Sequence, residues 1–431
     1  MAKKIVIIGN GISGITAARH IRKFSDNEIL VVSAETDYFF SRTALMYIYM
    51  GHMKFEHTKP YEDWFWEKNR IQLKNTFIQK VNTEQKILFT DSNEKITYDQ
   101  LILATGSTTH KRGWQGENLQ GVQGLVSKQD LDLLEENTKN CKQAIIVGGG
   151  LIGVELAEML HTRKIPVKML IREEAFWRNV LPQTEAQLIS NHIEQQGIEL
   201  LYNTELEKII GDENNRVQKI ITKKDEEIDC DFLGITTGVK PNISFLSDSE
   251  IETDKGILVN KYLETNCKDV FAIGDCAQQR ESIGNRKPIE AVWYTGRMMG
   301  ETIAQTICGN KTAYNPGNWF NSAKFFDIEY QTYGWVFPEA LTGHEDFYWV
   351  NKKDEKCLHF QFEIENRKFT GINTFGIRLR HEVVDFWLTE NKTIDFVIDN
   401  LAKANFDKEF SKKYEQKIRL EFKLTKTQEK I

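Results

Sequence analysis

The sequence has few cysteines and none of the spacings that bind metal ions. Its six cysteines are scattered over 431 residues without a C-x-x-C pair, which argues against a disulfide framework and a metal cluster and indicates reduced thiols. It has no run of about 18 apolar residues and no signal peptide before the first apolar stretch. We therefore expect a soluble, cytoplasmic protein with no transmembrane segment. A net charge of −6 gives no general attraction to nucleic acid or to an anionic membrane.

The chain contains a glycine-rich motif almost at its start. An apolar strand at residues 5–8 runs into Gly-Asn-Gly-Ile-Ser-Gly, and an apolar helical pattern follows. This order of strand, G-x-G-x-x-G and helix is that of a Rossmann dinucleotide site. Gly9 allows the tight turn, Gly11 leaves room for a pyrophosphate, and Gly14 lets the helix pack on the strand, with Ser13 beside it. Alone, the motif is also compatible with a tight turn that binds nothing.

A second motif of the same kind begins at residue 148. The strand at residues 144–147 leads into Gly148, Gly150 and Gly153, with Ile152 between the last two, and a helical pattern follows. Two complete βαβ units in one chain predict two bound dinucleotides. A length of 431 residues is also too great for one core, so two or three domains are expected.

Two charged residues follow the second strand, which we expect at residues 28–32. Glu35 lies about 20 positions after the first glycines, where a Rossmann site holds a ribose hydroxyl; a solvated turn carboxylate is the alternative. Arg42 stands in an aromatic stretch at residues 38–45. It is a candidate to bind a cofactor phosphate, or else a surface arginine beside a hydrophobic cluster.

The rest of the chain divides into segments with different patterns of expected secondary structure. Residues 71–103 predict a β-meander of four short strands and a final apolar strand, and residues 113–124 predict a crossover between domains. From residue 318, strand-like runs precede helical patterns at residues 381–388 and 394–402, which indicates an α+β domain. Ile418, Leu420, Phe422 and Leu424 alternate with charged residues. This alternation favours an edge strand or a fraying tail over a membrane helix.

Together these motifs resemble the FAD-dependent pyridine nucleotide oxidoreductases, the two-dinucleotide flavoproteins similar to glutathione reductase. The resemblance runs from residue 3 to about residue 305. It is most similar to the branch without a redox disulfide: ferredoxin and rubredoxin reductases and the flavoprotein part of assimilatory nitrite reductase. The matching segments are residues 9–14, 38–45, 104–106, 148–155, 237–242, 271–277 and 321–334.

The resemblance implies an α/β fold with two Rossmann-like domains and a C-terminal α+β domain. Residues 1–112 and 245–317 would bind FAD, residues 113–244 would bind NAD(P)H, and residues 318–431 would form the third domain, through which the chain could oligomerise. The implied FAD contacts are Gly9, Gly11, Ser13, Gly14, Glu35, Arg42, Val81, Ala104, Thr105, Gly106, Gly274, Asp275 and Trp293. The implied NAD(P)H contacts are Gly148, Gly150, Ile152, Gly153, Arg172, Arg178 and Gly238. For Trp293 an ordinary core aromatic is the alternative.

The chain departs from the family pattern at two positions. Disulfide-using relatives carry a cysteine where Thr43 stands, so reduction of thiols or disulfides through a cysteine relay is not expected. Glu155 matches a carboxylate that often pairs with a lysine near flavin N5, and that lysine position is Tyr47 here. Glu155 and Tyr47 are therefore the catalytic candidates. A raised pKa or another donor is expected for Glu155, and a role in capping or solvating the helix is its alternative.

The choice between NADH and NADPH depends on the end of the strand at residues 167–171. Arg172 and Arg178 resemble an NADPH-binding arginine pair, whereas Glu173 and Glu174 would repel a 2′-phosphate or accept a ribose hydroxyl. We expect the arginines to prevail narrowly, because neighbouring side chains on a turn usually diverge.

The function expected from these features is hydride transfer from NAD(P)H to FAD and electron transfer onward. The acceptor would be a small electron carrier similar to ferredoxin or rubredoxin, or a siroheme protein. The alternatives are an NAD(P)H oxidase or quinone reductase, and a slow-turnover flavoprotein with a binding or assembly role. No metal site and no nucleic-acid partner are expected.

Overall fold

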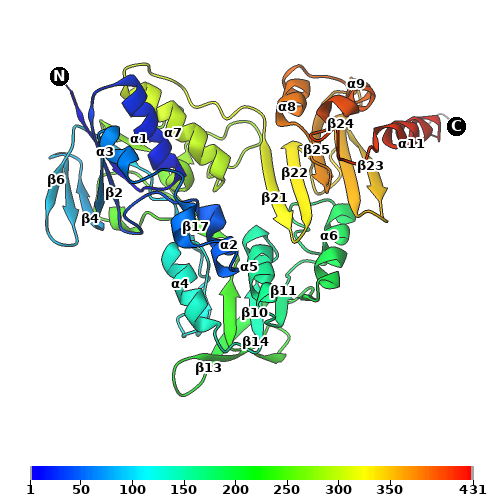
Figure 1. Cartoon of the computed structure of the whole chain (residues 1–431), viewed down its shortest axis with the longest axis horizontal. Helices are drawn as coiled ribbons and strands as arrows, with labels where there is room; N and C mark the ends of the chain where they lie inside the picture. The colour runs from blue at the N-terminus through cyan, green and yellow to red at the C-terminus, as the bar shows by residue number, and fades with distance from the viewer. Residues whose placement is uncertain (1, 429–431) are drawn as a thin grey trace.

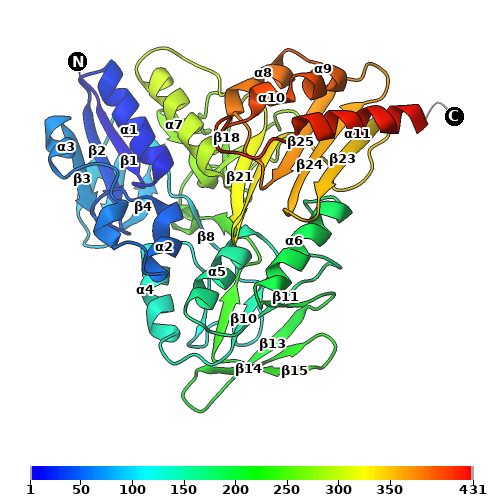
Figure 2. The same cartoon turned by 45° about the vertical axis from the view of Figure 1, so that its right-hand side comes forward.

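The computed structural model describes residues 2–428, in which three sheet-based units lie at the corners of a triangle (Figure 1). The α/β class with two parallel sheets and a C-terminal antiparallel sheet is confirmed. The N-terminal end of the chain and helix α11 lie on opposite sides of the molecule in both views (Figure 2). No helix in residues 2–428 is long and apolar enough to cross a membrane.

The first unit is a parallel sheet with the order β19-β7-β1-β2-β3. Its central strands are apolar and buried on both faces, as expected for parallel strands covered by helices. Its elements are β1 (Lys4–Ile8), α1 (Ile12–Phe24), β2 (Glu28–Ser33), β3 (Ile71–Asn75), β7 (Gln100–Leu103), β19 (Val270–Ala272) and α7 (Trp293–Ile307), with the short α2 (Leu45–Tyr49) and α3 (Trp64–Lys68) between β2 and β3.

The expected four-stranded meander was wrong at its first strand. Ile71 pairs with Ile29 of β2, so β3 extends the parallel sheet. The chain between them, with α2 and α3, supplies the crossover that a parallel pair requires. Only β4 (Ile78–Asn82), β5 (Ile87–Thr90) and β6 (Lys95–Thr97) form an antiparallel sheet.

Two helices of the first unit approach each other through glycines. Gly296 and Gly300 of α7 face the start of α1, and a Cβ on Gly300 would lie 2.6 Å from the backbone oxygen of Ser13. Figure 1 shows α1 and α7 side by side. This contact fixes the N-terminal turn of α1 against the sheet.

The second unit is a parallel sheet with the order β12-β11-β10-β16-β9 and an antiparallel arm, β13-β14-β15. The expected crossover at residues 113–124 contributes β9, which pairs with β16. The elements are β9 (Val122–Gln123), α4 (Lys128–Asn137), β10 (Ala144–Val147), α5 (Leu151–Thr162), β11 (Val167–Leu170), α6 (Gln183–Gln195), β12 (Glu199–Leu201), β13 (Leu206–Gly211), β14 (Val217–Thr222), β15 (Glu227–Asp229) and β16 (Phe232–Ile235). Strands β8 (Ser107–Thr109) and β17 (Val239–Pro241) pair where the chain passes between the units.

The third unit is an antiparallel sheet with the order β21-β22-β25-β24-β23. Helices α8 to α11 cover one face, and residues from α5 and α6 of the second unit pack against the other. The elements are β21 (Phe320–Phe325), β22 (Ile328–Gly334), β23 (His344–Asn351), β24 (Lys356–Glu363), β25 (Phe369–Phe375), α8 (His381–Thr389), α9 (Ile394–Asp399), α10 (Leu401–Ala404) and α11 (Glu415–Gln428). The C-terminal sheet is thus buried on both sides.

The prediction of an edge strand or frayed tail near the C-terminus was wrong, because the segment forms α11. Ile418 and Phe422, four residues apart, are buried against the sheet, and the Phe422 ring meets that of Phe347 edge-on. Leu420 and Leu424 point outward. The segment is helical because this spacing of four lets one face pack on β23.

Candidate functional site

The first glycine motif forms a cradle with one open position. Gly9 has φ +113°, and a Cβ there would lie 2.1 Å from the oxygen of Ala104. A Cβ on Gly14 would lie 2.1 Å from the oxygen of Gly9, so both glycines are required by the fold. A Cβ on Gly11 would meet nothing within 4 Å. The motif therefore closes behind Gly9 and Gly14 and leaves room at Gly11, where α1 begins without a side-chain cap.

The second motif repeats this arrangement. A Cβ on Gly148 (φ +120°) or on Gly153 would lie within 2.7 Å of a backbone oxygen, whereas a Cβ on Gly150 would meet nothing within 4 Å. Helix α5 begins after Gly150 without a side-chain cap, and Ile152 lies in its first turn. Gly238, with φ +101°, is likewise open and lies between β16 and β17. Both cradles fit a phosphate held by free backbone N–H groups.

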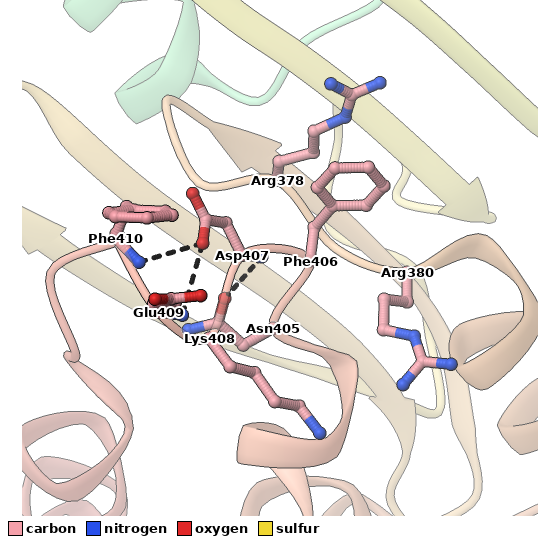
Figure 3. A pocket seen from close by; sticks show the side chains of 8 residues that line it. All are labelled: Arg378, Arg380, Asn405, Phe406, Asp407, Lys408, Glu409 and Phe410. Carbon is pink, nitrogen blue, oxygen red and sulfur yellow. Dashed lines mark hydrogen bonds between the residues drawn. The ribbon is translucent and has the colours of Figure 1, made fainter.

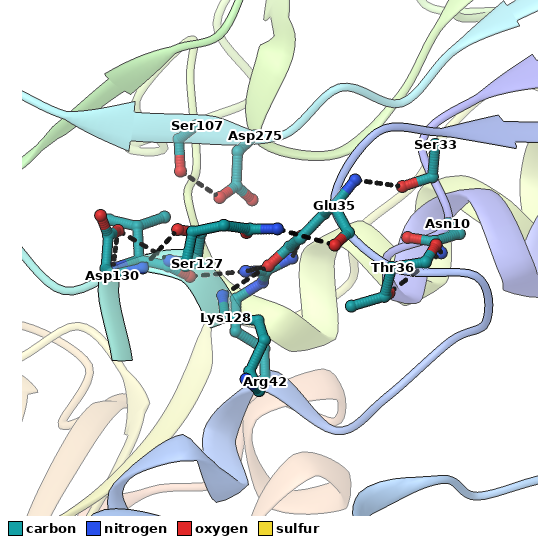
Figure 4. A network of polar contacts seen from close by, with 12 residues as sticks. Asn10, Ser33, Glu35, Thr36, Arg42, Ser107, Ser127, Lys128, Asp130 and Asp275 are labelled. Carbon is teal, nitrogen blue, oxygen red and sulfur yellow. Dashed lines mark hydrogen bonds and ion pairs between the residues drawn. The ribbon is translucent and has the colours of Figure 1, made fainter. Parts of the chain in front are cut away.

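Glu35 and Arg42 are bonded to each other (Figure 4). Arg42 Nη1 donates to Glu35 Oε1 at 2.8 Å, and the other guanidinium nitrogen contacts Oε2 at 2.5 Å. The backbone N–H of Lys128, at the start of α4, also donates to Glu35 Oε1 at 2.9 Å. A carboxylate has about four acceptor positions, so Glu35 can still accept from a ribose hydroxyl. Arg42 would have to give up one of its two contacts with Glu35 before it could bind a phosphate or the flavin end of FAD.

Asp275 lies across the network from Glu35, on the turn after β19 (Figure 4). Burial raises its pKa, while the hydroxyl of Ser107, which donates to Asp275 Oδ2 at 2.9 Å, and the charge of Arg42 oppose the shift. Gly274 approaches Ser13 so closely that a Cβ would lie 2.4 Å from the Ser13 hydroxyl oxygen. Asp275 is thus held next to the first cradle, where a buried carboxylate can accept hydroxyl hydrogen bonds.

The other residues implied for FAD lie on neighbouring strands and turns. Ala104 and Thr105 follow β7, and the Thr105 hydroxyl donates to the Asn242 oxygen at 2.7 Å. Gly106 has φ +67° with open space around it. Val81 is buried in β4 within the core of the first unit. Ala104, Thr105 and Gly106 thus lie at the carboxyl end of the first sheet, where ligands of open α/β sheets bind, whereas Val81 lies in the antiparallel sheet.

Trp293 is the first residue of α7, and 38% of its surface is exposed, so it is not a core aromatic. Its neighbour Tyr294 bonds through its hydroxyl to Ser322 of β21 at 3.0 Å and packs against Phe320. The start of α7 is therefore anchored to the C-terminal sheet while the Trp293 ring keeps an exposed face.

Glu155 lies on α5 one turn beyond the second cradle. Burial, with a smaller contribution from Glu158, raises its pKa to about 7, and Lys324 opposes the shift. Tyr47, on α2, packs beside His52 at a ring distance of 6.1 Å, and α2 contacts α5. The pKa of Glu155 is therefore raised, as expected, and the positive charge of Lys324 on β21 keeps it from rising further.

The structure gives Arg172 and Arg178 different partners. Arg172 is exposed and pairs with Glu173 at 2.7 Å, so the expectation that these neighbours diverge was wrong. Arg178 is 16% exposed; it donates to the Pro338 oxygen at 3.2 Å and pairs with Glu339 at 2.7 Å. Arg178 thus holds a loop of the C-terminal unit, and Arg172 is the residue left to face solvent.

Four residues at the site were missed by sequence reasoning: Ser107, Lys128, Glu158 and Lys324. The resemblance included Lys324 only as part of residues 321–334, and no motif pointed to the others. Each acts through a contact with a residue distant in sequence or one helical turn away, which a strand–turn–helix pattern does not encode.

One thiol, that of Cys276, lies beside these groups and contacts Thr105. Cys276 follows Asp275 but is completely buried, and its sulfur faces the backbone oxygens of Leu103 and Ile273. Thr43 is exposed near Arg42. None of the six cysteines, all of which lie in the described part of the chain, is in a disulfide. In residues 2–428, no group of His, Cys, Asp and Glu is arranged to hold a metal ion.

Residues 3–300 match the family model described as pyridine nucleotide-disulphide oxidoreductase. The chain belongs to this family of NAD(P)H-using oxidoreductases. It is 31% identical over 314 residues to nitrite reductase [NAD(P)H] of Bacillus subtilis, covering 72% of this chain and 38% of that protein. The chain thus spans about two fifths of the length of this relative.

Two other relatives are covered more fully. The chain is 30% identical over 343 residues to NADH oxidase of Methanocaldococcus jannaschii, with 76% of this chain and 75% of that protein covered. It is 27% identical to rubredoxin-NAD(+) reductase of Ectopseudomonas oleovorans, with 72% and 80% covered. A solved ferredoxin reductase from Rhodopseudomonas palustris shares the fold, with a TM-score of 0.78, 19% identity, and coverage of 86% and 91%.

Proposed function

We propose that this chain is a flavoprotein reductase that binds FAD at the first cradle and NAD(P)H at the second. The observation that carries the proposal is the pair of open positions at Gly11 and Gly150, each at the start of a helix and each framed by glycines that the fold requires. When bound, FAD would accept a hydride from NAD(P)H and release electrons singly or in pairs.

The chain's own residues have distinct parts in this function. Glu35 and Asp275 accept hydrogen bonds from cofactor hydroxyls, and Arg42 supplies positive charge beside them. Trp293 presents an exposed ring at the start of α7. Glu155, with a pKa of about 7, can hold or release a proton at neutral pH.

We propose a small electron-carrier protein as the acceptor. The absence of a thiol at Thr43 and the burial of Cys276 leave this site without a cysteine relay, and the rubredoxin reductase relative supports a protein acceptor. The alignment with the NADH oxidase relative covers about three quarters of each protein. This relative supports dioxygen as the second candidate acceptor.

The quinone reductase alternative requires an amphipathic helix to meet a membrane surface. The alternation of apolar residues near the C-terminus favoured a strand there, but the segment is helix α11. The apolar face of α11 is nevertheless occupied, because Ile418 and Phe422 are buried in its own domain. Among the side chains of α11 whose exposure is described, residues 415–425, only the apolar Leu420 and Leu424 point outward, which is little apolar area for membrane binding.

The experiment is anaerobic mixing of the purified chain with NADH or NADPH in a stopped-flow spectrometer. We expect one FAD per chain, bleaching of its visible absorbance within the time of a turnover, and fast reoxidation by a rubredoxin or ferredoxin but slow reoxidation by dioxygen. Rapid reoxidation by dioxygen alone would favour the oxidase. Bound flavin that NAD(P)H does not bleach would favour the binding or assembly role.

We also propose that two copies associate through the C-terminal domain. A cavity of about 780 Å³ there is lined by Arg378, Arg380, Asn405, Phe406, Asp407, Lys408, Glu409 and Phe410 (Figure 3). Phe406 and Phe410 are 53% and 82% exposed, and large aromatic rings exposed together are typical of a protein interface. The cavity carries both Arg378 and Glu409, so a second copy can meet it with charges of both signs.

A further inference from the structure

Two carboxylates on α5 feel the charge of one lysine from another part of the chain, but only one of them is paired with it. Glu155 and Glu158 are three positions apart, which places them as neighbours on one side of the helix. Lys324 Nζ, from β21, lies 2.8 Å from Glu158 Oε1. The Glu158 side chain is 12% exposed and the Lys324 side chain 41% exposed, so solvent reaches the pair mainly from the lysine side. Within residues 2–428, the Glu155 side chain has no hydrogen bond or ion pair.

The elements packed around Glu155 bring few other charges. Helix α2, which packs against α5, carries no charged side chain over Leu45–Tyr49. On the sheet beneath, β10 and β16 are entirely uncharged. Lys168 of β11 is paired with Glu199 at 3.0 Å. Lys324 and Glu158 are therefore the charges that act on Glu155.

We propose that Lys324 is a positioning residue that sets the charge of Glu155 by neutralising Glu158. The inference rests on the proposed function, because the resemblance assigns Glu155 to the flavin site. Relatives supply a lysine from the position of Tyr47, whereas this chain supplies one from the C-terminal sheet. Lys324 favours the charged form of Glu155, and an unpaired Glu158 disfavours it. The C-terminal domain thus contributes to the proton balance of the dinucleotide site.

The test compares variants with opposite expected effects in the FAD-loaded protein. The readouts are the pH dependence of the flavin midpoint potential and the pH profile of flavin reduction by NADH. Lys324→Met should move the Glu155 titration to higher pH by about one unit. Glu158→Gln should move it to lower pH, and the double variant should lie near the wild type. Lys324→Arg should restore the wild-type profile, and Glu155→Gln should remove the titration from every background.

Asp327→Asn is the matched control. Asp327 lies in the turn between β21 and β22 and pairs with His192 of α6 at 2.7 Å. This substitution also removes a polar contact between the C-terminal and second units, but it leaves Glu158 paired. We expect an unchanged titration. An equal shift in Asp327→Asn would mean that domain contact, not the Lys324 charge, sets the profile, and the proposal would fail.

Shifts in the same direction for Lys324→Met and Glu158→Gln, or none in either, would also overturn the proposal. The wild-type bleaching experiment is separate from these results. If NAD(P)H reduces the wild type but the Lys324 variants leave the titration unchanged, the role of Lys324 is rejected and the proposed function stands. A wild type that binds FAD but is not reduced would reject the proposed function.

Discussion

Gly11 and Gly150 differ from the other motif glycines in having open space where a side chain would be. Gly11→Val should therefore fold and lose FAD, because the branched side chain fills the room for a pyrophosphate. We expect flavin content to fall at least tenfold, measured by absorbance and by released FAD, with an unchanged circular dichroism spectrum. Normal flavin content in Gly11→Val would mean that the first motif is not the FAD site.

Gly150→Val is the reciprocal variant. Its φ of −122° is compatible with valine, so we expect a yellow protein with full FAD content that NADH and NADPH no longer bleach. Loss of FAD from both variants would show instead that either substitution damages the fold.

We expect Arg172 to decide between NADH and NADPH. The arginine is exposed and paired with Glu173, and a 2′-phosphate would compete with that carboxylate for charge-assisted hydrogen bonds. We expect NADPH to have the better kcat/KM, and Arg172→Ala to lower the NADPH to NADH ratio about tenfold, or about 1.4 kcal/mol. The loss should be in KM, because the phosphate binds equally in ground and transition states.

The variants Glu173→Gln and Arg178→Ala separate the contributions of Arg172 and Arg178 to the preference for NADPH. Glu173→Gln frees Arg172 and should raise the preference for NADPH. Arg178→Ala removes the contacts with Pro338 and Glu339, so it should lower Tm and leave the cofactor ratio unchanged. A wild type that prefers NADH and is indifferent to Arg172→Ala would assign Glu173 or Glu174 to a ribose hydroxyl.

At the level of elements, α6 is joined to the C-terminal sheet by a buried charge cluster. Glu185 of α6 is completely buried. His359 Nδ1 lies 2.8 Å from Glu185 Oε1, His359 Nε2 lies 3.3 Å from Asp346 Oδ1, and Asn373 Nδ2 donates to Glu185 Oε2 at 2.8 Å. Burial alone would lower the pKa of His359, but Asp346 and Glu185 raise it to about 9. A protonated His359 therefore bridges two carboxylates of different units.

This cluster predicts a loss of stability at alkaline pH. The folded pKa of about 9 lies above the ordinary 6.5, so the contribution is fully present below pH 6.5 and is lost as pH rises through 9. We expect Tm to fall over this window by an amount equivalent to a few kcal/mol. His359→Gln should have a lower Tm at pH 6 and a flatter profile up to pH 9. The same slope in His359→Gln would assign the pH dependence to other groups.

Elements were predictable from the sequence where their signal is local. The β1–α1–β2 and β10–α5–β11 units follow from a buried strand, a glycine turn and a helical period, all within about 30 residues. The partner of β3 was not predictable. The residues around Ile71 are equally compatible with a strand of an antiparallel meander and with an edge strand of a parallel sheet. The period of α11 was ambiguous, because apolar residues at every second position also provide the spacing of four that buries Ile418 and Phe422. The pairing of Lys324 with Glu158 depends on how distant units pack.

At the scale of the whole molecule, the exposed aromatics of the C-terminal domain predict a dimer. Phe406 and Phe410 should lie in its interface, where truncation of a central, well-packed ring can cost more than about 1 kcal/mol. We expect the wild type to sediment as a dimer, and Phe406→Ser with Phe410→Ser to weaken association about tenfold or more.

Phe24→Ser is a suitable control for the dimer, since Phe24 is 49% exposed at the end of α1 in the first unit. It should leave the sedimentation coefficient unchanged, and all variants should keep their FAD. A wild type that stays monomeric at tens of micromolar would contradict the prediction.

The contact between α1 and α7 affects when the first unit can form during synthesis. Its sheet and its helical layer combine segments that precede the second unit in the chain with β19 and α7, which follow it. A nascent chain on the ribosome therefore exposes β7 and one side of α1 until residue 307 has emerged. The second unit, whose strands are contiguous, can fold in the meantime. The second unit, which we propose to bind NAD(P)H, is thus expected to fold before the first unit, which we propose to bind FAD. A chain truncated before Trp293 should therefore bind pyridine nucleotide but not flavin.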